Sequence, residues 1–564
     1  MAGGLFQLLG MGARSLSAAQ LAQATVGNNA ANAATPGYSR QRTTLVEAPT
    51  VQLGNLAFGT GVQTADLVRL RDALVDVQRR ADSQEFQYSK AQSGILSQIE
   101  SLFGPADEAG LAGALNGLFA AFGDLSAHPE DPATRSALLG QGQAFADAAR
   151  QTHDRLARLE ANTFGTLSDR VSEVNTTAAR LAQINTQRVG GVSDPSLADE
   201  QDRLVDRLAE LIGARATRRD DGSVQVVIDG TGVQLVDGPK AATVALSGLP
   251  ASGTASLTVN GLALTQTRGE IGGLLDMRNS TSDGLPSVLN GLDALVSGVI
   301  EAVNRVHASG AGRDLSQSVT GSVVVSNPAA MLNAAGLWVT PTNGTLTLGV
   351  FDASGNFVSS GSVAVDPTTM SLNDLAAAID ALANISATVT GGQLVVSATN
   401  PANRLAFGSD TSDSLVALGV NGFFTGTDAA TVAVSGALTA DPYLIAAAQA
   451  DFTAGVVSPG DGRNAQALAS LATSTVLNAG TQTPSDFLGA LGSAVGTNSQ
   501  NASNRADTQE ALLQAANAQQ QSTSGVNLDE ELTDMVRYQH AYEASAKYIQ
   551  TVDEMIQALL GILQ

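Results

Sequence analysis

Apolar and small residues at the two ends of the chain recur at alternating spacings of four and three. The N-terminal series consists of Leu5, Leu9, Gly12, Leu16, Ala19, Gln23, Val26, Ala30 and Ala33. The C-terminal series consists of Leu528, Leu532, Met535, Gln539, Tyr542, Ala546, Ile549, Asp553, Ile556, Leu560 and Leu563; only Gln539 and Asp553 break the apolar run, and Val552 and Leu559 widen the stripe. Such spacing places the side chains on one stripe of a helix, as in a coiled coil. The pattern predicts one long amphipathic helix at each end. We expect Asn527 to cap the C-terminal helix at its third amide, with Glu530 reaching back in a capping box.

Neither terminal helix is expected to be stable in water without a partner for its apolar stripe. The simplest hypothesis is that the two helices pack against each other and against neighbouring subunits. The alternative is a pair of ordinary surface helices on one core.

The interior alternates between helical and β-rich stretches. One helix is predicted to begin near Asp66 and to end at Gly104-Pro105, where proline stops helical hydrogen bonding. Further helices are predicted over residues 132–188, 196–212, 286–307, 464–478 and 484–521. Short Val-rich runs between Asp-Gly turns predict hairpins within residues 214–268. Residues 311–450, rich in Thr, Val and Gly, predict further strands around a helix at 372–382.

These patterns predict an elongated multidomain protein. Its terminal and body domains are α-helical and coiled-coil-like, and its inserted outer domains are β-rich (α+β). The predicted division is a terminal helical domain (1–45 with 525–564), a helical body (46–213 with 269–310 and 453–524), a small β subdomain (214–268) and a β-rich outer insertion (311–452).

Composition argues against several classes of function. The net charge of −23 disfavours nucleic acid and anionic membranes as partners. The absence of cysteine excludes disulfides, thiol nucleophiles and Cys-ligated metals. No uninterrupted apolar run of about 18 residues is present, so we expect no membrane insertion. The N-terminal sequence has no basic region before an apolar core, so we expect no Sec-type signal peptide.

No motif in the sequence carries catalytic chemistry. The four histidines form no His-Glu-x-x-His pair, and His307 is interpreted as a satisfied core or capping residue. Asp410, Asp413 and Asp428 lack the spacing of an EF-hand loop and are interpreted as turn residues. We therefore predict no catalytic, cofactor or metal site.

The end of the first predicted helix carries the motif Asn28-Asn-Ala-Ala-Asn-Ala-Ala-Thr-Pro-Gly-Tyr-Ser-Arg-Gln41. Pro36 ends the helix, Gly37 allows a positive φ, and Asn32 and Thr35 can bond to local backbone. The motif resembles the corresponding segment of the bacterial flagellar hook-associated protein 1 family, with Ala30 and Ala34 standing where Ile and Asn are usual. Further stretches of the chain resemble the same family, namely residues 199–206, 269–276, 303–307, 460–468, 524–531 and 538–547.

The resemblance implies a structural protein of the flagellum, located outside the cell at the hook–filament junction. It implies export from the cytoplasm through the flagellar type III apparatus and assembly with copies of itself as a ring. The implied partners are the hook protein, the next hook-associated protein and a cytosolic export chaperone at the C-terminal helix. The residues expected to pack between subunits are Leu5, Leu9, Leu16, Val26, Asn32, Thr35, Pro36, Gly37 and Tyr38. Those expected both to pack and to bind the chaperone are Leu528, Leu532, Met535, Tyr538, Tyr542, Ile549, Ile556 and Leu560.

The sequence is compatible with two alternatives. The chain is compatible with another flagellar axial protein, although Tyr38-Ser-Arg-Gln41 argues against hook protein and the middle of the chain argues against flagellin. A secreted adhesin or an enzyme is the other alternative, with residues 311–450 as the active head.

Overall fold

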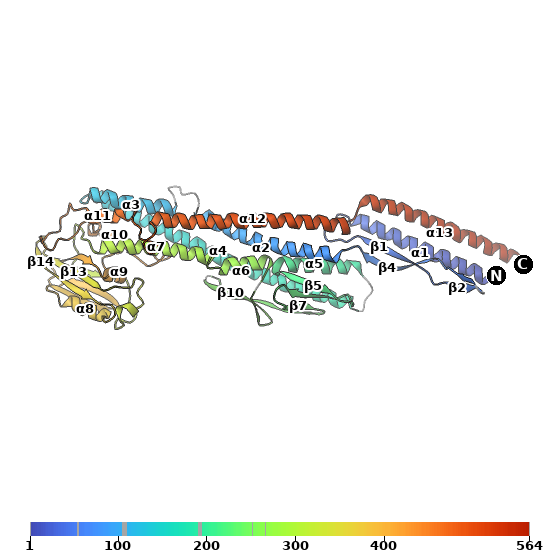
Figure 1. Cartoon of the computed structure of the whole chain (residues 1–564), viewed down its shortest axis with the longest axis horizontal. Coiled ribbons are helices and arrows are strands. Elements are labelled where there is room, and N and C mark those ends of the chain that lie inside the picture. The colour runs from blue at the N-terminus through green and yellow to red at the C-terminus, as the bar shows by residue number, and fades with distance from the viewer. Residues whose placement is uncertain are drawn as a thin grey trace. The chain divides into compact units, whose positions relative to one another are not determined.

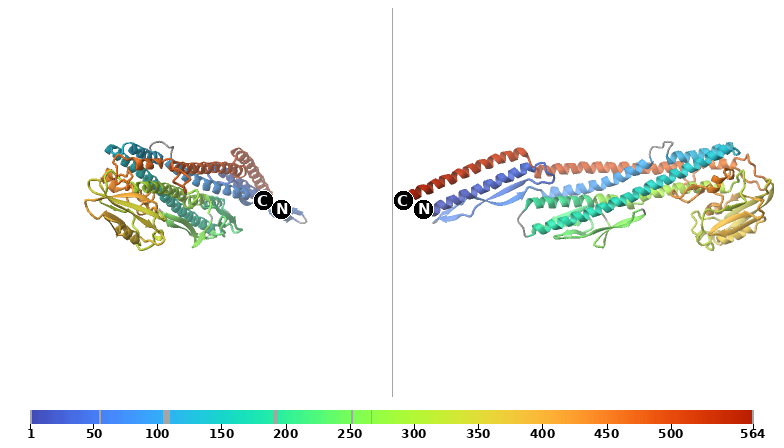
Figure 2. Two further views of the ribbon diagram at one scale, coloured as in Figure 1. Left: turned by 60° about the vertical axis from the view of Figure 1, so that its left-hand side comes forward. Right: turned by 180° about the vertical axis from the view of Figure 1, so that it is seen from behind.

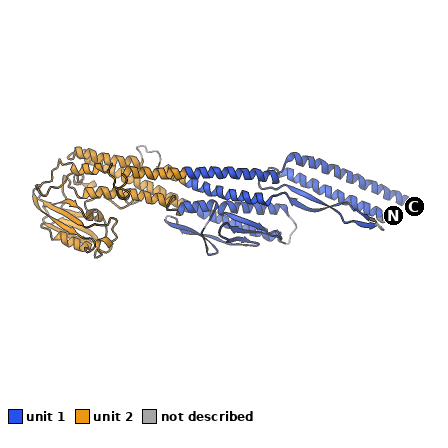
Figure 3. Ribbon diagram, in the orientation of Figure 1, with its two compact units in different colours: residues 1–95, 163–278, 500–564 blue, residues 96–162, 279–499 orange. Residues whose placement is uncertain are grey.

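A computed structural model of the chain describes residues 2–53, 56–103, 110–189, 194–250, 252–265 and 267–562. The chain divides into two compact units, which Figure 3 colours separately. The first comprises residues 1–95, 163–278 and 500–564, and the second comprises residues 96–162 and 279–499. Three long helices contribute to both units: α2 (Ala73–Phe103), α4 (Pro132–Arg188) and α12 (Pro484–Ser524). The finer division into four domains stays a prediction.

In the first unit, helices α1 (Ala2–Ala31) and α13 (Leu528–Ile562) lie side by side and antiparallel, as both Figure 1 and Figure 2 show. Gly12 lies where the two helices meet. A Cβ atom on this glycine would come within 2.7 Å of Ile549 Cγ1, so the missing side chain allows close approach. The prediction that both chain ends are helical is confirmed.

The face that α13 turns toward the rest of the unit differs in part from the predicted stripe. The buried or half-buried residues of the helix are Glu531, Asp534, Met535, Tyr538, Tyr542, Ser545, Ala546, Tyr548, Ile549, Val552, Ile556 and Leu559. The predicted series shares Met535, Tyr542, Ala546, Ile549 and Ile556 with this face. Its exposed members are Leu528, Leu532, Gln539, Asp553 and Leu560. Residues seven apart lie on one line along a helix. Between two of them the seam needs one further residue, and the spacing allows either of two adjacent residues to supply it. Leu532, Gln539, Asp553 and Leu560 were the wrong choice, because the residue before each of them lies on this face instead. Leu563 lies outside the described residues.

The segment after α1 forms extended structure. Strands β1 (Gln41–Glu47) and β4 (Val62–Arg69) pair antiparallel. Strands β2 (Val51–Leu53) and β3 (Leu56–Phe58), which lie between them in the sequence, pair with each other. The predicted helix start near Asp66 was therefore wrong, because Asp66 and Leu67 pair with Thr44 and Thr43 of β1. Pairing with a distant strand overrode the local helical pattern, and α2 begins only at Ala73.

The rest of the first unit packs α5 (Pro195–Ile212) and α6 (Gly269–Asn279) with two small sheets. One sheet holds β5 (Ala214–Arg218), β6 (Val224–Ile228), β7 (Gln234–Asp237) and β8 (Lys240–Ala241). The other holds β9 (Val244–Leu249), β10 (Ser252–Val259) and β11 (Leu262–Leu264). Asn185 anchors the first sheet to α4, because its side-chain amide donates to Val224 O and Gly238 O, both at 2.8 Å. The predicted hairpins are confirmed.

The second unit combines helices with an α+β module. The helices are α3 (Leu111–Ala127), α7 (Leu285–Ala308), α9 (Ser414–Leu418), α10 (Gly436–Ala440) and α11 (Arg463–Ser470). The module contains β12 (Ser318–Thr320), β13 (Gly344–Phe351), β14 (Phe357–Val365), α8 (Leu372–Asp380), β15 (Ile385–Thr390), β16 (Gln393–Ala398) and β17 (Arg404–Asp410). A short hairpin pairs β18 (Phe424–Thr425) with β19 (Ala433–Val434). The predicted α+β character of the insertion is confirmed.

Two helical predictions in this unit need correction. Helix α3 was not predicted, and the helix expected over 464–478 ends at Ser470. The following residues turn instead, since Asn478 and Ala479 adopt positive φ and Leu477 bridges to Gln482.

Helix α7 has the length and apolar composition of a membrane span, although polar and charged residues interrupt its sequence. Twelve of its residues are buried within the second unit: Leu285, Val288, Leu292, Leu295, Val296, Val299, Ile300, Ala302, Val303, Asn304, His307 and Ala308. The predicted interpretation of His307 is confirmed. Its Nδ1 lies 2.8 Å from Asn421 O, and its Nε2 accepts from Ala446 N at 3.0 Å.

Candidate assembly interface

A buried carboxylate joins the two terminal helices. Glu531 of α13 is 1% exposed, and its Oε2 accepts from Asn29 Nδ2 of α1 at 2.9 Å. Its Oε1 accepts from Arg40 Nε at 2.6 Å. Burial lowers the pKa of the Arg40 guanidinium, but Glu531 and Glu530 outweigh burial and leave that pKa raised. We call Asn29, Arg40 and Glu531 the terminal latch, because together they join α1, α13 and the segment that leads into β1.

The motif that ends α1 folds around the amide of Asn29. Its Nδ2 also donates to Gln41 O at 2.8 Å, while its Oδ1 accepts from Gln41 N at 3.0 Å and from the Tyr38 hydroxyl at 2.8 Å. Burial, together with the carboxylates of Asp199 and Glu531, raises the pKa of Tyr38 to about 12. Tyr38 therefore stays a neutral donor, and the Asn29 side chain has all its hydrogen-bonding groups satisfied.

The predicted turn chemistry of the same motif is confirmed. Asn32 Nδ2 donates to Asn28 O at 3.0 Å, and the Thr35 hydroxyl donates to Asn32 Oδ1 at 3.2 Å. Gly37 has a φ of 81°, in the left-handed region that favours glycine.

The predicted capping box at the start of α13 was wrong. Asn527 does cap the helix, but its Oδ1 accepts from the second helical amide, Asp529 N, at 3.0 Å. Glu530 does not reach back, because its carboxylate accepts from Arg40 Nη1 at 2.7 Å. An ion pair with a distant residue took the place of the local hydrogen bond.

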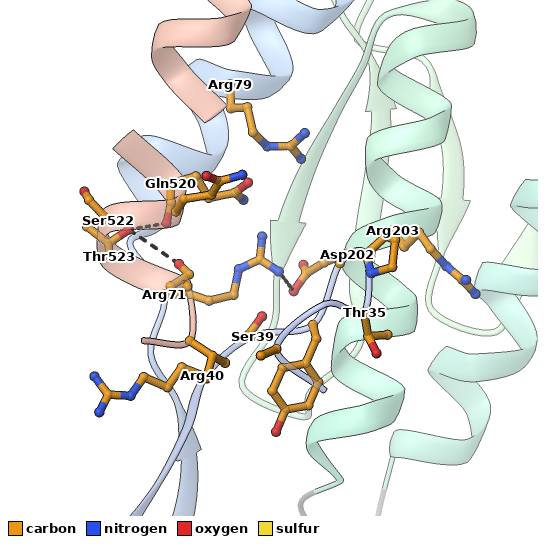
Figure 4. A pocket seen from close by; sticks show the side chains of 18 of the residues that line it. Thr35, Ser39, Arg40, Arg71, Arg79, Asp202, Arg203, Gln520, Ser522 and Thr523 are labelled. Atoms are coloured by element: carbon orange, nitrogen blue, oxygen red, sulfur yellow. Dashed lines mark hydrogen bonds and ion pairs between the residues drawn. The ribbon is translucent and has the colours of Figure 1, made fainter. Parts of the chain in front are cut away.

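A cluster of arginines surrounds Asp202 of α5. Its carboxylate lies 2.7 Å from Arg69, 2.8 Å from Arg71 and 3.0 Å from Arg218. Burial alone would raise the pKa of Asp202, but Arg71, Arg69 and Arg218 outweigh it and lower that pKa. Figure 4 shows Arg71 reaching across to Asp202. The cluster holds the start of α2 and the end of β4 against α5. Sequence reasoning missed it because its members lie far apart along the chain.

A polar pocket of about 950 Å³ opens beside this cluster. Its charged lining residues are Arg40, Arg71, Arg79, Asp202, Arg203, Asp206, Arg207, Glu210 and Glu530. These side chains largely neutralise one another: Arg79 and Arg80 pair with Asp206, and Arg207 pairs with Glu210 at 2.9 Å. Among the described residues, no group of three or more metal-binding side chains gathers in a way that would hold a metal ion.

Two apolar surfaces lie at opposite ends of the paired terminal helices. The first, which we call the groove, has a volume of about 530 Å³ and is lined by Gly4, Leu5, Gln7, Leu8, Met11, Val51, Phe58, Gly59, Thr60, Met555, Ala558 and Leu559. The second, which we call the patch, consists of the exposed residues Leu528, Leu532 and Val536 near the start of α13. Both surfaces are apolar and open to solvent in the single chain.

The residues predicted to pack between subunits fall into three groups. Val26 is buried within the first unit. Those that are half-buried are Leu5, Leu9, Leu16, Asn32, Tyr38, Met535, Tyr538, Tyr542, Ile549 and Ile556. Those that are exposed are Thr35, Pro36, Gly37, Leu528, Leu532 and Leu560. Leu5 lines the groove, and Leu528 and Leu532 form the patch. Sequence reasoning missed Phe58 and Met555, because neither lies on the predicted stripes.

Comparison with known proteins gives a consistent result along the chain. Residues 96–322 match the family model for the helical domain of the flagellar hook-associated protein FlgK. Residues 518–562 match the model for the C-terminal region of the flagellar basal body rod FlgEFG proteins.

Full-length relatives carry one name. Flagellar hook-associated protein 1 of Escherichia coli (strain K12) is 27% identical, with 97% of this chain and 98% of the relative covered. The proteins of the same name from Salmonella typhimurium and Bacillus subtilis (strain 168) are 28% and 26% identical, and each comparison covers 97% of this chain and at least 96% of the relative. The flagellar hook junction protein FlgK from Burkholderia pseudomallei matches in structure with a TM-score of 0.54 and 18% identity, over 79% of this chain and all of that one. At this identity, the match shows a shared fold.

Proposed function

Because the chain belongs to the flagellar hook-associated protein 1 family, we propose that it is a structural subunit that joins the hook to the filament as an adaptor ring. The observation that supports this function most directly is the pair of terminal helices. Its inner face is closed by the terminal latch, while the groove and the patch remain uncovered. Exposed apolar surface of this kind is typical of a protein that is completed by a partner.

The positions of the groove and the patch favour a second copy as that partner. Met555 in the groove and Leu532 in the patch lie on the same helix, separated by about 35 Å at about 1.5 Å per residue. Contact between the patch of one copy and the groove of the next joins two different surfaces. A head-to-tail contact of this kind generates a ring or a helical array rather than a closed dimer.

The remaining expectations follow from the family. We infer that the protein performs no catalysis, and that it contacts the hook protein and the next hook-associated protein. We also infer that it leaves the cytoplasm through the type III apparatus. A cytosolic chaperone that covers α13 before export would shield Leu528, Leu532 and Val536, which otherwise promote aggregation.

The proposal is tested by complementing flagellated cells that lack the protein. A fluorescently tagged wild-type chain is expected at one spot between hook and filament. Leu532→Glu, which places a charge in the patch, should leave hooks without filaments. Leu512→Glu is the matched control, because Leu512 is an exposed leucine on α12 outside the patch. Normal filaments with Leu532→Glu, or equal loss with both variants, would contradict the proposal.

A further inference from the structure

The oxidisable sulfur of this chain resides only in methionine, because cysteine is absent and seven methionines are present. Met555 and Met331 are the exposed ones among the described methionines, at 50% and 41%. Met11, Met370 and Met535 are half-buried, and Met277 is buried. Exposure governs how readily a thioether meets a dissolved oxidant, so Met555 and Met331 are the accessible sites.

Met555 differs from Met331 in its surroundings, because it lines the groove beside Leu5, Phe58 and Leu559. Among the described residues that line this groove none is charged, and Gln7 and Thr60 carry the two polar side chains. The Thr60 hydroxyl already donates to Pro49 O at 2.8 Å. A thioether suits such a site, since methionine is apolar and adapts its shape to a partner.

We propose that Met555 is an oxidative modification site that controls whether the groove accepts a partner. Hydrogen peroxide transfers one oxygen atom to the thioether sulfur; the sulfide is oxidised to a sulfoxide and the peroxide is reduced to water. The new S=O group is a polar acceptor in a groove whose described lining is otherwise apolar apart from Gln7 and Thr60. This inference rests on the proposed function, because it takes the occupant of the groove to be a second copy of this chain.

The modification acts on the free subunit and not on the assembled one. In the free chain half of the Met555 side chain meets solvent, whereas a copy seated in the groove covers it. Losing the favourable burial of one methionine weakens such a contact by about tenfold.

The test compares the wild-type protein with two substitutions that remove one thioether each while keeping its apolar bulk. Met555→Leu removes the proposed site, and Met331→Leu is the matched control in the second unit. Each purified full-length chain is treated with hydrogen peroxide and then added to hooks isolated from cells that lack the protein. The copies bound per hook are counted, because each further copy binds beside an earlier one through its groove. Peptide mass spectrometry measures the sulfoxide at each methionine, with buried Met277 as the internal reference.

Peroxide should lower hook binding about tenfold for the wild type and for Met331→Leu, and leave Met555→Leu unchanged. Methionine sulfoxide reductases should restore the binding of the treated wild type. Full binding with Met555 oxidised, or equal loss for Met555→Leu, would overturn the inference while leaving the proposed function intact. Failure of the untreated wild type to bind hooks would instead contradict the proposed function, and this inference with it.

Discussion

Removing the Glu531 carboxylate should release the two terminal helices from each other. In the Glu531→Ala variant, Asn29 Nδ2 keeps its hydrogen bond to Gln41 O but loses its carboxylate acceptor. Arg40 loses its ion pair with the buried carboxylate. Breaking a buried pair by removing one partner costs about 3–5 kcal/mol. We expect about 3 kcal/mol, the lower end, because the Arg40 side chain is 21% exposed and retains Glu530.

The assay is hydrogen exchange of the amides in α1 and α13, since the chain has more than one unit and a single free energy of unfolding is not defined. A loss of about 3 kcal/mol lowers protection by about a hundredfold. Glu531→Gln keeps an acceptor for Asn29 and loses the charge, so its cost should be about 1–2 kcal/mol.

The matched control is Glu530→Ala, which removes the other carboxylate that Arg40 contacts. Glu530 is 59% exposed, and exposed ion pairs contribute about 0–1 kcal/mol. If the Glu530 and Glu531 variants lost protection equally, or if Glu531→Ala left α1 and α13 fully protected, the idea that the terminal latch holds the two helices together would be wrong.

Two further predictions concern the rest of the chain. Gly273→Ala should lower the local stability of α2 and α6 by about 2 kcal/mol, seen as faster hydrogen exchange of their amides, because its Cβ would lie 2.4 Å from Tyr88 O and force α6 away from α2. Gly165→Ala, with open space around it on α4, should leave that exchange unchanged. His307 is fully buried, and burial lowers its pKa to about 4. As pH falls from about 6.5 to 4, the unfolded chain binds a proton before the folded chain does, so the second unit should lose about 3 kcal/mol of stability over this window. Hydrogen exchange of the α7 amides at pH 7 and pH 4, corrected for the intrinsic rates, should show this loss in the wild type and a smaller one in His307→Gln, which does not titrate; equal losses would contradict it.

Periodicity predicted most of the long helices, because a long amphipathic pattern averages over many residues. It failed where distant pairing decides the outcome. Residues 66–69 continue the helical pattern of α2 in the sequence, yet they belong to β4 because they pair with β1. The helix α3 had a signal that was overlooked, since Leu111, Leu115, Leu118, Phe122 and Leu125 recur at helical spacing and are buried.

The candidate site was only partly predictable. The turn chemistry of Asn32, Thr35 and Gly37 is local, so sequence reasoning found it. The terminal latch joins residues about 500 positions apart, and nothing in the sequence pairs Asn29 with Glu531. The buried stripe of α13 places a glutamate where an apolar residue was expected, because Asn29 and Arg40 satisfy its charge.

The most direct measurement of head-to-tail packing is disulfide cross-linking between copies. The natural chain has no cysteine, so an introduced pair reports a single contact. We choose Gln7→Cys, which lines the groove, and Thr533→Cys, which lies next to Leu532 of the patch. Within one copy these positions are too far apart to join, because a disulfide requires Cα atoms within about 7 Å. Head-to-tail packing predicts a ladder of cross-linked oligomers from oxidised hook–filament junctions that carry both cysteines, and none from either single variant. Junctions that assemble normally with both cysteines yet yield only monomers would contradict it.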